Sequence, residues 1–319
     1  MNMQQQLATL TDWLSSQIIG QEHLVQRLLI ALLADGHLLV EGAPGLAKTK
    51  AIKTLADAIE GDYNRIQFTP DLLPADVTGT DIYRPEQGSF EFQAGPIFHN
   101  LVLADEINRA PAKVQSALLE AMAERQVSVG NKTYPLPPLF MVMATQNPIE
   151  QEGTYPLPEA QLDRFLLHVN VDYPSVEAER KILSLVRAEA SHEAQSAPAP
   201  LSQETVMRAR QEILKLHMSE AVEEYIVQLI NATRRPGQYS EQLAGLLEYG
   251  ASPRGTIALE RCARAHAWLA GKDFVSPDDV AAVLHDCLRH RIILSFEAEA
   301  DGTTRDQVID LLLKSVAIA

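Results

Sequence analysis

The stretch LLVEGAPGLAKT, which runs from Leu38 to Thr49, decides the fold of this chain. An apolar run leads into a Gly-rich turn, and beyond Lys-Thr the apolar residues recur at helical spacing. Successive backbone N–H groups in such a turn, reinforced by the positive end of the following helix, point at phosphate oxygens. We therefore predict that Lys48 reaches the β- and γ-phosphates of a nucleoside triphosphate and that the Thr49 hydroxyl binds Mg²⁺.

One position of this loop departs from the common pattern, because Ala47 stands where most such loops have Gly. A glycine there lets the backbone approach the phosphate closely, although one outward methyl group can be accommodated. Taken alone, the stretch also fits an ordinary strand-to-helix turn. The residues of this segment that we expect to bind nucleotide are Gly42, Ala43, Pro44, Gly45, Leu46, Ala47, Lys48, Thr49 and Lys50.

Length and composition set the broad class of protein. With 319 residues, of which 46% are hydrophobic and 22% charged, the chain is typical of soluble globular proteins and long enough for two domains. No apolar run approaches the ~18–20 residues that span a bilayer, and the first residues do not have the pattern of a secretory signal. We therefore expect a cytoplasmic protein with no membrane span.

The charge and the cysteines limit the classes of partner and cofactor. The formal net charge is −15 and no Lys- or Arg-rich tract is present, which argues against nucleic acid as a partner. Basic residues gathered on one face would still permit it. Cys262 and Cys287 do not have the spacing of metal ligands, so we expect them to be buried in helices as small apolar residues.

Apolar patterns divide the chain into two parts. Between residue 37 and about residue 172, strands alternate with helices, which predicts a parallel sheet with crossover helices and hence an α/β fold. The expected strands are 37–41, 64–68, 100–104, 139–145 and 166–171, and the expected helices are 48–60, 111–125 and 158–164. Segments 83–95 and 127–134 interrupt this alternation as β-hairpins. Helical patterns follow at 202–216, 219–233, 253–270, 276–291 and 304–316. We predict an α/β nucleotide-binding domain over residues 1–173 and an α-helical domain over residues 174–319.

Polar residues follow two of the predicted strands. Asp105 and Glu106 end the apolar run 101–104, where Asp105 suits Mg²⁺ binding, directly or through another ligand, and Glu106 suits polarising the attacking water. Asn147 follows the next strand, at the edge where open α/β sheets bind ligands, and its amide can orient that water. An alternative for Asn147 is that Asn-Pro only begins a turn.

Two arginines are further candidates. Arg164 follows an amphipathic turn, from which a guanidinium can stabilise charge on a γ-phosphate, although a surface ion pair with Asp163 explains it equally well. Arg254 opens a helix in the second part, in Ser252-Pro253-Arg254-Gly255, and is placed to fold over phosphates. The local sequence alone does not decide the role of either arginine.

Together, and in this order, these motifs resemble the AAA+ ATPases and, within them, the MoxR family, in which Ala before the Lys is the usual residue. The resemblance covers nearly the whole chain and implies an AAA+ core with two β-hairpin inserts followed by an α-helical lid. It identifies residues 42–49 as Walker A, Asp105 and Glu106 as Walker B, and Asn147 as sensor 1. It identifies Arg164 as the arginine finger and Arg254 as sensor 2. The segment Ile18-Ile19-Gly20-Gln21 matches the family's adenine-side segment, in which Ile19 and Gly20 are expected to bind nucleotide.

The resemblance also implies a mechanism and partners. It implies a homo-oligomeric ring, expected to be a hexamer, with ATP and Mg²⁺ at each subunit boundary and hydrolysis to ADP and phosphate. Its implied clients are proteins, often with von Willebrand factor A domains, which such ATPases remodel or assist in metal or cofactor insertion. Three alternatives remain at this point: a nucleic-acid translocase, a magnesium-chelatase-like ATPase subunit, and a scaffold that binds ATP and scarcely hydrolyses it.

Overall fold

The chain forms two compact units. A computed structural model of the protein describes residues 3–148, 153–191 and 197–318. Contacts group Met1–Arg164 with Val169–Met207, and Phe165–His168 with Arg208–Ala319. Across the described ranges, no helix is long and apolar enough to cross a membrane.

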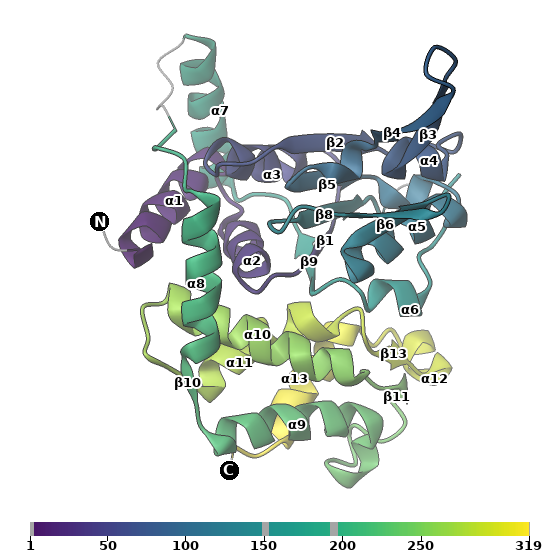
Figure 1. Ribbon diagram of the computed structural model, residues 1–319. Helices are drawn as coiled ribbons and strands as arrows, with labels where there is room; N and C mark the ends of the chain where they lie inside the picture. Colours follow the sequence, from purple (N-terminus) through teal and green to yellow (C-terminus); the bar gives the residue numbers. More distant parts are fainter. Residues whose placement is uncertain (1–2, 149–152, 192–196, 319) are drawn as a thin grey trace. The chain divides into compact units, whose positions relative to one another are not determined.

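The first unit is built on a five-stranded sheet in the order β2-β5-β8-β1-β9 (Figure 1). Its strands are β1 (Leu38–Gly42), β2 (Tyr63–Gln67), β5 (Leu101–Asp105), β8 (Met141–Gln146) and β9 (Leu167–Val171). β5 pairs in parallel with β2 and β8, and β8 pairs in parallel with β1. All residues of β5 are buried, as expected for a strand covered on both faces. The predicted α/β fold with a parallel sheet is therefore confirmed.

Helices flank this sheet (Figure 1). They are α1 (Met3–Gln17), α2 (Glu22–Leu33), α3 (Lys48–Asp57), α4 (Pro74–Thr78), α5 (Ala112–Glu124), α6 (Glu159–Leu162) and α7 (Val176–Ala190), with 3₁₀ turns η1 (Pro96–Phe98) and η2 (Ile107–Arg109). α3 and α6 are shorter than predicted, and α7 was not predicted. The Ile59–Leu201 β-bridge and the ion pair between Lys50 and Glu189 connect the segment after β9 to the first unit. The contacts therefore group residues 174–191 and 197–207 with this unit, whereas the sequence assigned them to the helical domain.

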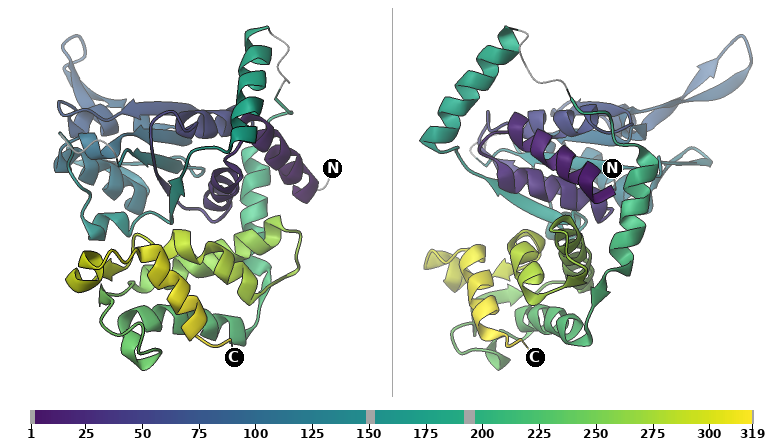
Figure 2. Two further views of the ribbon diagram at one scale, coloured as in Figure 1. Left: turned by 180° about the vertical axis from the view of Figure 1, so that it is seen from behind. Right: turned by 90° about the vertical axis from the view of Figure 1, so that its left-hand side faces the viewer.

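Both predicted hairpins are present in the first unit. One consists of β3 (Gly79–Arg84) and β4 (Ser89–Ala94), and the other of β6 (Gln126–Val129) and β7 (Lys132–Pro135). The first begins four residues earlier than predicted, and Figure 2 shows it extending beyond the sheet. Phe92 stacks on Tyr134 with ring centroids 3.9 Å apart, so the two hairpins contact each other through an aromatic pair.

The second unit is mainly helical. Its elements are α8 (Gln203–Lys215), which enters it from the first unit, α9 (Glu220–Arg234), η3 (Pro236–Gln238), α10 (Pro253–Leu269), α11 (Pro277–Leu288), α12 (Phe296–Ala300) and α13 (Arg305–Ser315). The two-stranded sheets β10 (His217–Met218) with β12 (Phe274–Val275), and β11 (Leu247–Tyr249) with β13 (Ile293–Leu294), were not predicted. Cys262 and Cys287 are fully buried in α10 and α11, as predicted.

A buried carboxylate holds the start of α11 in place. Asp279 is fully buried and accepts hydrogen bonds from Lys272 Nζ at 2.8 Å and from Ser276 Oγ at 2.6 Å, and its Oδ1 lies 2.9 Å from His266 Nδ1. Burial by itself raises the pKa of Asp279, but the hydrogen bonds from Lys272, Ser276 and His266 outweigh burial and lower this pKa to about 2. The charged form of Asp279 therefore stabilises the folded second unit.

We predict that Asp279→Asn lowers the free energy of unfolding at pH 7 by about 2 kcal/mol, because the variant loses charge-assisted hydrogen bonds. A folded pKa below the unfolded value means that the contribution of Asp279 is complete above about pH 4 and is lost as the pH falls toward 2. Urea denaturation at pH 7 and at lower pH measures both effects. Asp273→Asn, an exposed position nearby, is the control, and equal stability of the two variants would contradict the prediction.

Candidate nucleotide site

The loop between β1 and α3 has the backbone geometry that phosphate binding needs. Gly45 has φ +82° and Ala47 has φ +57°, so the chain turns through left-handed conformations just before Lys48 begins α3. A side chain at Gly42 would place its Cβ 2.6 Å from the Val171 carbonyl oxygen, so glycine is required there by the close approach of β9. Backbone N–H groups of this turn lie at the N-terminus of α3, which favours an anion.

A cavity of about 360 Å³ joins this loop to the ends of β5 and β8. It is lined by Pro44, Gly45, Leu46, Ala47, Lys48, Thr49, Lys50, Asp105, Glu106, Thr145 and Asn147. The structure therefore brings together most of the residues that the sequence singled out. Gly42 and Ala43 instead line a neighbouring cavity of about 340 Å³, which shares Leu46 with the first and is closed by residues 170–173.

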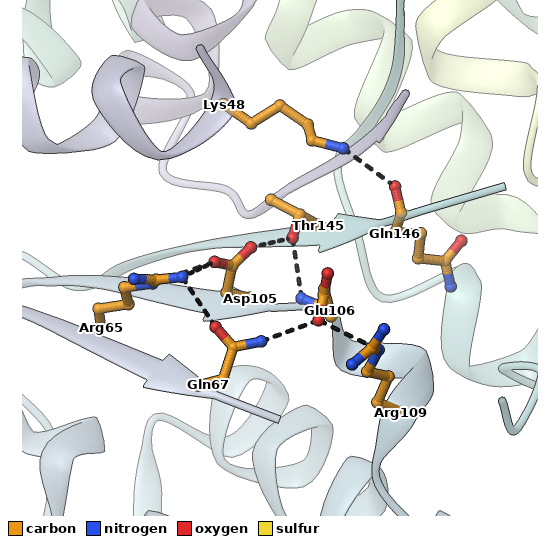
Figure 3. Close-up of polar contacts among 8 residues, drawn as sticks. All are labelled: Lys48, Arg65, Gln67, Asp105, Glu106, Arg109, Thr145 and Gln146. Atoms are coloured by element: carbon orange, nitrogen blue, oxygen red, sulfur yellow. Dashed lines mark hydrogen bonds and ion pairs between the residues drawn. The ribbon is translucent and has the colours of Figure 1, made fainter. Parts of the chain in front are cut away.

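Lys48 reaches from α3 to the end of the sheet. Its Nζ donates to the Gly42 carbonyl oxygen and, at 3.3 Å, to that of Gln146 (Figure 3). Burial lowers the pKa of Lys48, and the nearby carboxylates of Asp105 and Glu106 oppose this shift. An ammonium group that is partly desolvated beside carboxylates is suited to binding phosphate oxygens. Lys50, by contrast, pairs with Glu189 of α7 at 2.7 Å.

The Thr145 hydroxyl connects the two acidic residues. Its Oγ1 donates to Asp105 Oδ1 at 2.6 Å and accepts from the Glu106 backbone N–H at 2.9 Å (Figure 3). Glu106 has φ +55°, which costs a non-glycine residue about 1–2 kcal/mol. The hydrogen bond from its N–H to Thr145 helps to hold the Glu106 backbone in this strained conformation.

Side chains from β2 and η2 hold the two carboxylates. Arg65 donates to Asp105 Oδ2 from Nε at 3.0 Å and from Nη2 at 2.6 Å. Gln67 Nε2 donates to Glu106 Oε2 at 2.9 Å, and Arg109 Nε lies 3.1 Å from the same oxygen (Figure 3). Both contacts to Glu106 end on Oε2, so Oε1 is the oxygen of this carboxylate that suits a water molecule.

The remaining candidate residues lie elsewhere. Arg164 does not line the 360 Å³ cavity, and its Nη1 donates at 2.9 Å to the Leu119 carbonyl oxygen in α5. Arg254 is exposed in the first turn of the second unit's α10. Gly20 lies against Pro174 and Ala178, and Ile19 lines a separate surface cavity of about 500 Å³. Within the first unit, the structure thus gathers residues 44–50, Asp105, Glu106 and Asn147 around one cavity, which Ile19, Gly20 and Arg164 do not line.

Sequence reasoning missed four residues of the site, namely Thr145, Arg65, Gln67 and Arg109. Thr145 could have been identified from the sequence, because it lies two residues before Asn147 at the end of the same strand, where a hydroxyl can reach the neighbouring strand end. Arg65 and Gln67 lie on β2, which pairs with β5 so that Gln67 is opposite Asp105. Nothing in the local sequence of β2 identifies this pairing.

Comparison with known proteins agrees with the fold. Residues 37–167 match the ATPase family associated with various cellular activities (AAA), and residues 243–312 match the AAA lid domain. These matches and the site define an AAA+ ATPase. The chain is 47% identical to Chaperone MoxR1 of Mycobacterium tuberculosis over 94% of this chain and 79% of that protein. It is 32% identical to Protein MoxR of Methylorubrum extorquens over 97% of this chain and 96% of that protein.

A solved structure is similar over nearly the whole chain. The crystal structure of a protein from Cytophaga hutchinsonii, described as an ATPase, superimposes with a TM-score of 0.92 at 46% sequence identity, covering 99% of this chain and 96% of that one. This chain belongs to the MoxR family of AAA+ ATPases, and the resemblance inferred from its motifs is confirmed.

We predict that Thr145→Val lowers the free energy of unfolding by about 1–3 kcal/mol, because the partly buried Glu106 N–H loses its acceptor. It also lowers ATP turnover more than ATP affinity, since the backbone that carries Glu106 loses a support while the loop around Lys48 is untouched. Urea denaturation and steady-state ATPase kinetics measure the two effects. Thr133→Val, at an exposed position in β7, is the matched control. Unchanged turnover of Thr145→Val would argue against this role of the hydroxyl.

Proposed function

We propose that this protein hydrolyses ATP to ADP and phosphate within a homo-oligomeric ring and uses the energy to remodel or activate protein clients. One observation carries the proposal: a single cavity joins the phosphate loop to Glu106 and Asn147. A loop that binds phosphate without a base beside it would suit a scaffold, whereas this cavity places a carboxylate and an amide opposite Lys48.

The residues of the cavity fit ATP with Mg²⁺. Thr49 and Asp105 supply the hydroxyl and carboxylate oxygens that this ion prefers, and we assign them as the residues that hold it. The ion, when bound, offsets the negative charge of the phosphates. Lys48 and the backbone N–H groups of residues 44–49 hold the phosphates, and Ile19 and Gly20 are proposed to lie toward the adenine.

Glu106 and Asn147 are proposed to act on the attacking water. Glu106 accepts its proton through Oε1, while Gln67 and Arg109 hold Oε2 and so orient the carboxylate. Asn147, which is buried at the cavity wall, orients the water through its amide without adding charge. Arg254 is proposed to contact the phosphates and to report the nucleotide state to the helical unit.

Arg164 is proposed to complete the site of a neighbouring subunit. It does not line the cavity of its own chain, and a guanidinium supplied in trans is a common way to stabilise charge on a transferring phosphoryl group. A contact of one face with a different face of the next copy closes into a ring when the rotation allows it. We propose that this ring is a hexamer.

We predict that Arg164→Ala lowers turnover by about 10³-fold, while ATP affinity changes little, because the residue acts on the transition state at another subunit. In wild type, turnover per subunit rises with protein concentration as rings assemble, and this rise is absent in the variant. ATPase assays over a concentration series, with nucleotide binding measured separately, provide the test. Arg187→Ala, at an exposed position in α7, is the control. Full activity of Arg164→Ala would refute the trans assignment.

The proposed clients are proteins, with von Willebrand factor A domains as the leading class. A relative that shares 47% of its residues with this chain is named as a chaperone. The net charge of −15 weakens attraction to nucleic-acid phosphates and so favours a protein target. Assistance in metal or cofactor insertion is one form that such remodelling can take.

We predict that Glu106→Gln loaded with ATP captures protein clients from the lysate of its host, because it binds nucleotide but lacks the base for hydrolysis. Lys48→Ala, which loses the phosphate contact, captures none and is the control. Co-purification followed by protein identification, with and without nuclease, is the measurement. Recovery of nuclease-sensitive nucleic-acid complexes in place of a protein would favour a translocase and contradict the proposed clients.

A further inference from the structure

The four residues that follow Arg164 belong to the second unit. Contacts group Phe165–His168 with Arg208–Ala319, whereas Arg164 itself groups with the first unit. All four residues are buried, with exposed fractions between 0% and 8%. Phe165 thus directly follows the last residue that groups with the first unit, and Leu167 and His168 begin β9, a strand of that unit's sheet.

Two residues just after α11 hold the start of this segment through its backbone. Arg291 donates from Nη2 to the Phe165 carbonyl oxygen at 2.6 Å and from Nη1 to that of Leu166 at 3.1 Å. His290 Nε2 donates to the same Phe165 oxygen at 2.9 Å. The Phe165 carbonyl thus accepts two hydrogen bonds, one of them from a buried guanidinium.

Arg289, the residue before His290, holds the other end of this four-residue segment, at His168. Arg289 Nη1 donates to the His168 carbonyl oxygen at 2.6 Å. Its guanidinium also forms ion pairs with Asp286 at 3.0 Å and with Asp306 at 2.8 Å. We call Arg289, His290 and Arg291 the carbonyl clamp, since three consecutive residues bind the backbone of one four-residue segment.

The carbonyl clamp is expected to be rigid. Hydrogen bonds from charged donors are about twice as strong as neutral ones, and breaking them inside the protein leaves a buried charge without its partner. Burial, followed by the nearby charge of Arg291, lowers the pKa of His290 well below its usual value. His290 is therefore neutral at physiological pH and keeps the Nε2 proton that it donates to Phe165.

Arg164 directly precedes the segment that the clamp holds. Its Cα is about 3.8 Å from that of Phe165, which the clamp holds. Its side chain, at the other end, donates to Leu119 in α5. The carbonyl clamp therefore holds the backbone one peptide bond away from Arg164.

We propose that Arg289, His290 and Arg291 are positioning residues for Arg164, so that the placement of its guanidinium at a neighbouring subunit depends on how these three residues hold the segment after it. This inference rests on the proposed function, in which Arg164 acts in trans. A displacement of about 1 Å in a group that stabilises the transition state can lower a rate about 10²-fold. Loosening the clamp thus impairs the neighbour's site and leaves the variant's own nucleotide pocket intact.

Subunit mixing tests the inference. The clamp variants are Arg291→Lys, which lacks the planar fork, and His290→Leu, which lacks the donor. Each is assayed alone and mixed with Glu106→Gln, which carries an intact clamp and an intact Arg164 but lacks the base. Alone, each clamp variant should lose about 10²-fold in turnover, with ATP affinity within about threefold of wild type. In the mixture, turnover per clamp-variant subunit should rise several-fold, because Glu106→Gln neighbours supply a correctly placed Arg164.

Two controls separate the possible failures. Arg164→Ala should be rescued by Glu106→Gln in the same way; absence of that rescue would refute the trans role and, with it, the clamp inference. Rescue of Arg164→Ala without rescue of either clamp variant would overturn the clamp inference alone and leave the proposed function intact. His290→Gln, which keeps a donor near the Nε2 position, should retain most of the turnover. If Arg291→Lys fails to fold in thermal unfolding, the comparison of His290→Leu with His290→Gln decides, and equal turnover of these two overturns the inference.

Discussion

The parallel pairing of β1, β5 and β8 is the constraint on which the site depends. Carboxyl ends of parallel strands meet at one edge of a sheet, so the phosphate loop after β1, the acidic pair after β5 and Asn147 after β8 surround one cavity. The register that places Ala104 opposite Ala144 also brings the Thr145 hydroxyl to Asp105. A shift of one residue would turn that hydroxyl to the other face.

Two strained backbone positions of the first unit lie at the same edge. Among the described residues, four non-glycine positions have positive φ, and two of them, Ala47 and Glu106, line the cavity. Such conformations persist where the surrounding contacts hold them, as the Thr145 hydrogen bond does for Glu106. Ala47 and Glu106 sit at the sharp turns where the chain leaves the sheet. Their strained backbone is therefore part of how the site places Lys48 and the Glu106 carboxylate.

Buried charge organises the second unit. Asp279 ties the start of α11 to Lys272 and His266, and Arg289 and Arg291 at the other end of the same helix hold the segment after Arg164. Both ends of α11 are thus fixed by hydrogen bonds that involve charged groups.

The sequence by itself determined the alternation of strands and helices, the phosphate loop and the candidate roles of Asp105, Glu106 and Asn147, because periodicity and turn chemistry are local. It also indicated the family. Tertiary structure alone decided that Arg65 and Gln67 contact the acidic residues, that residues 174–191 and 197–207 group with the first unit, and that the segment after Arg164 is held by residues more than 120 positions away. These contacts depend on which strands pair and on how a distant turn packs, and no local pattern records either.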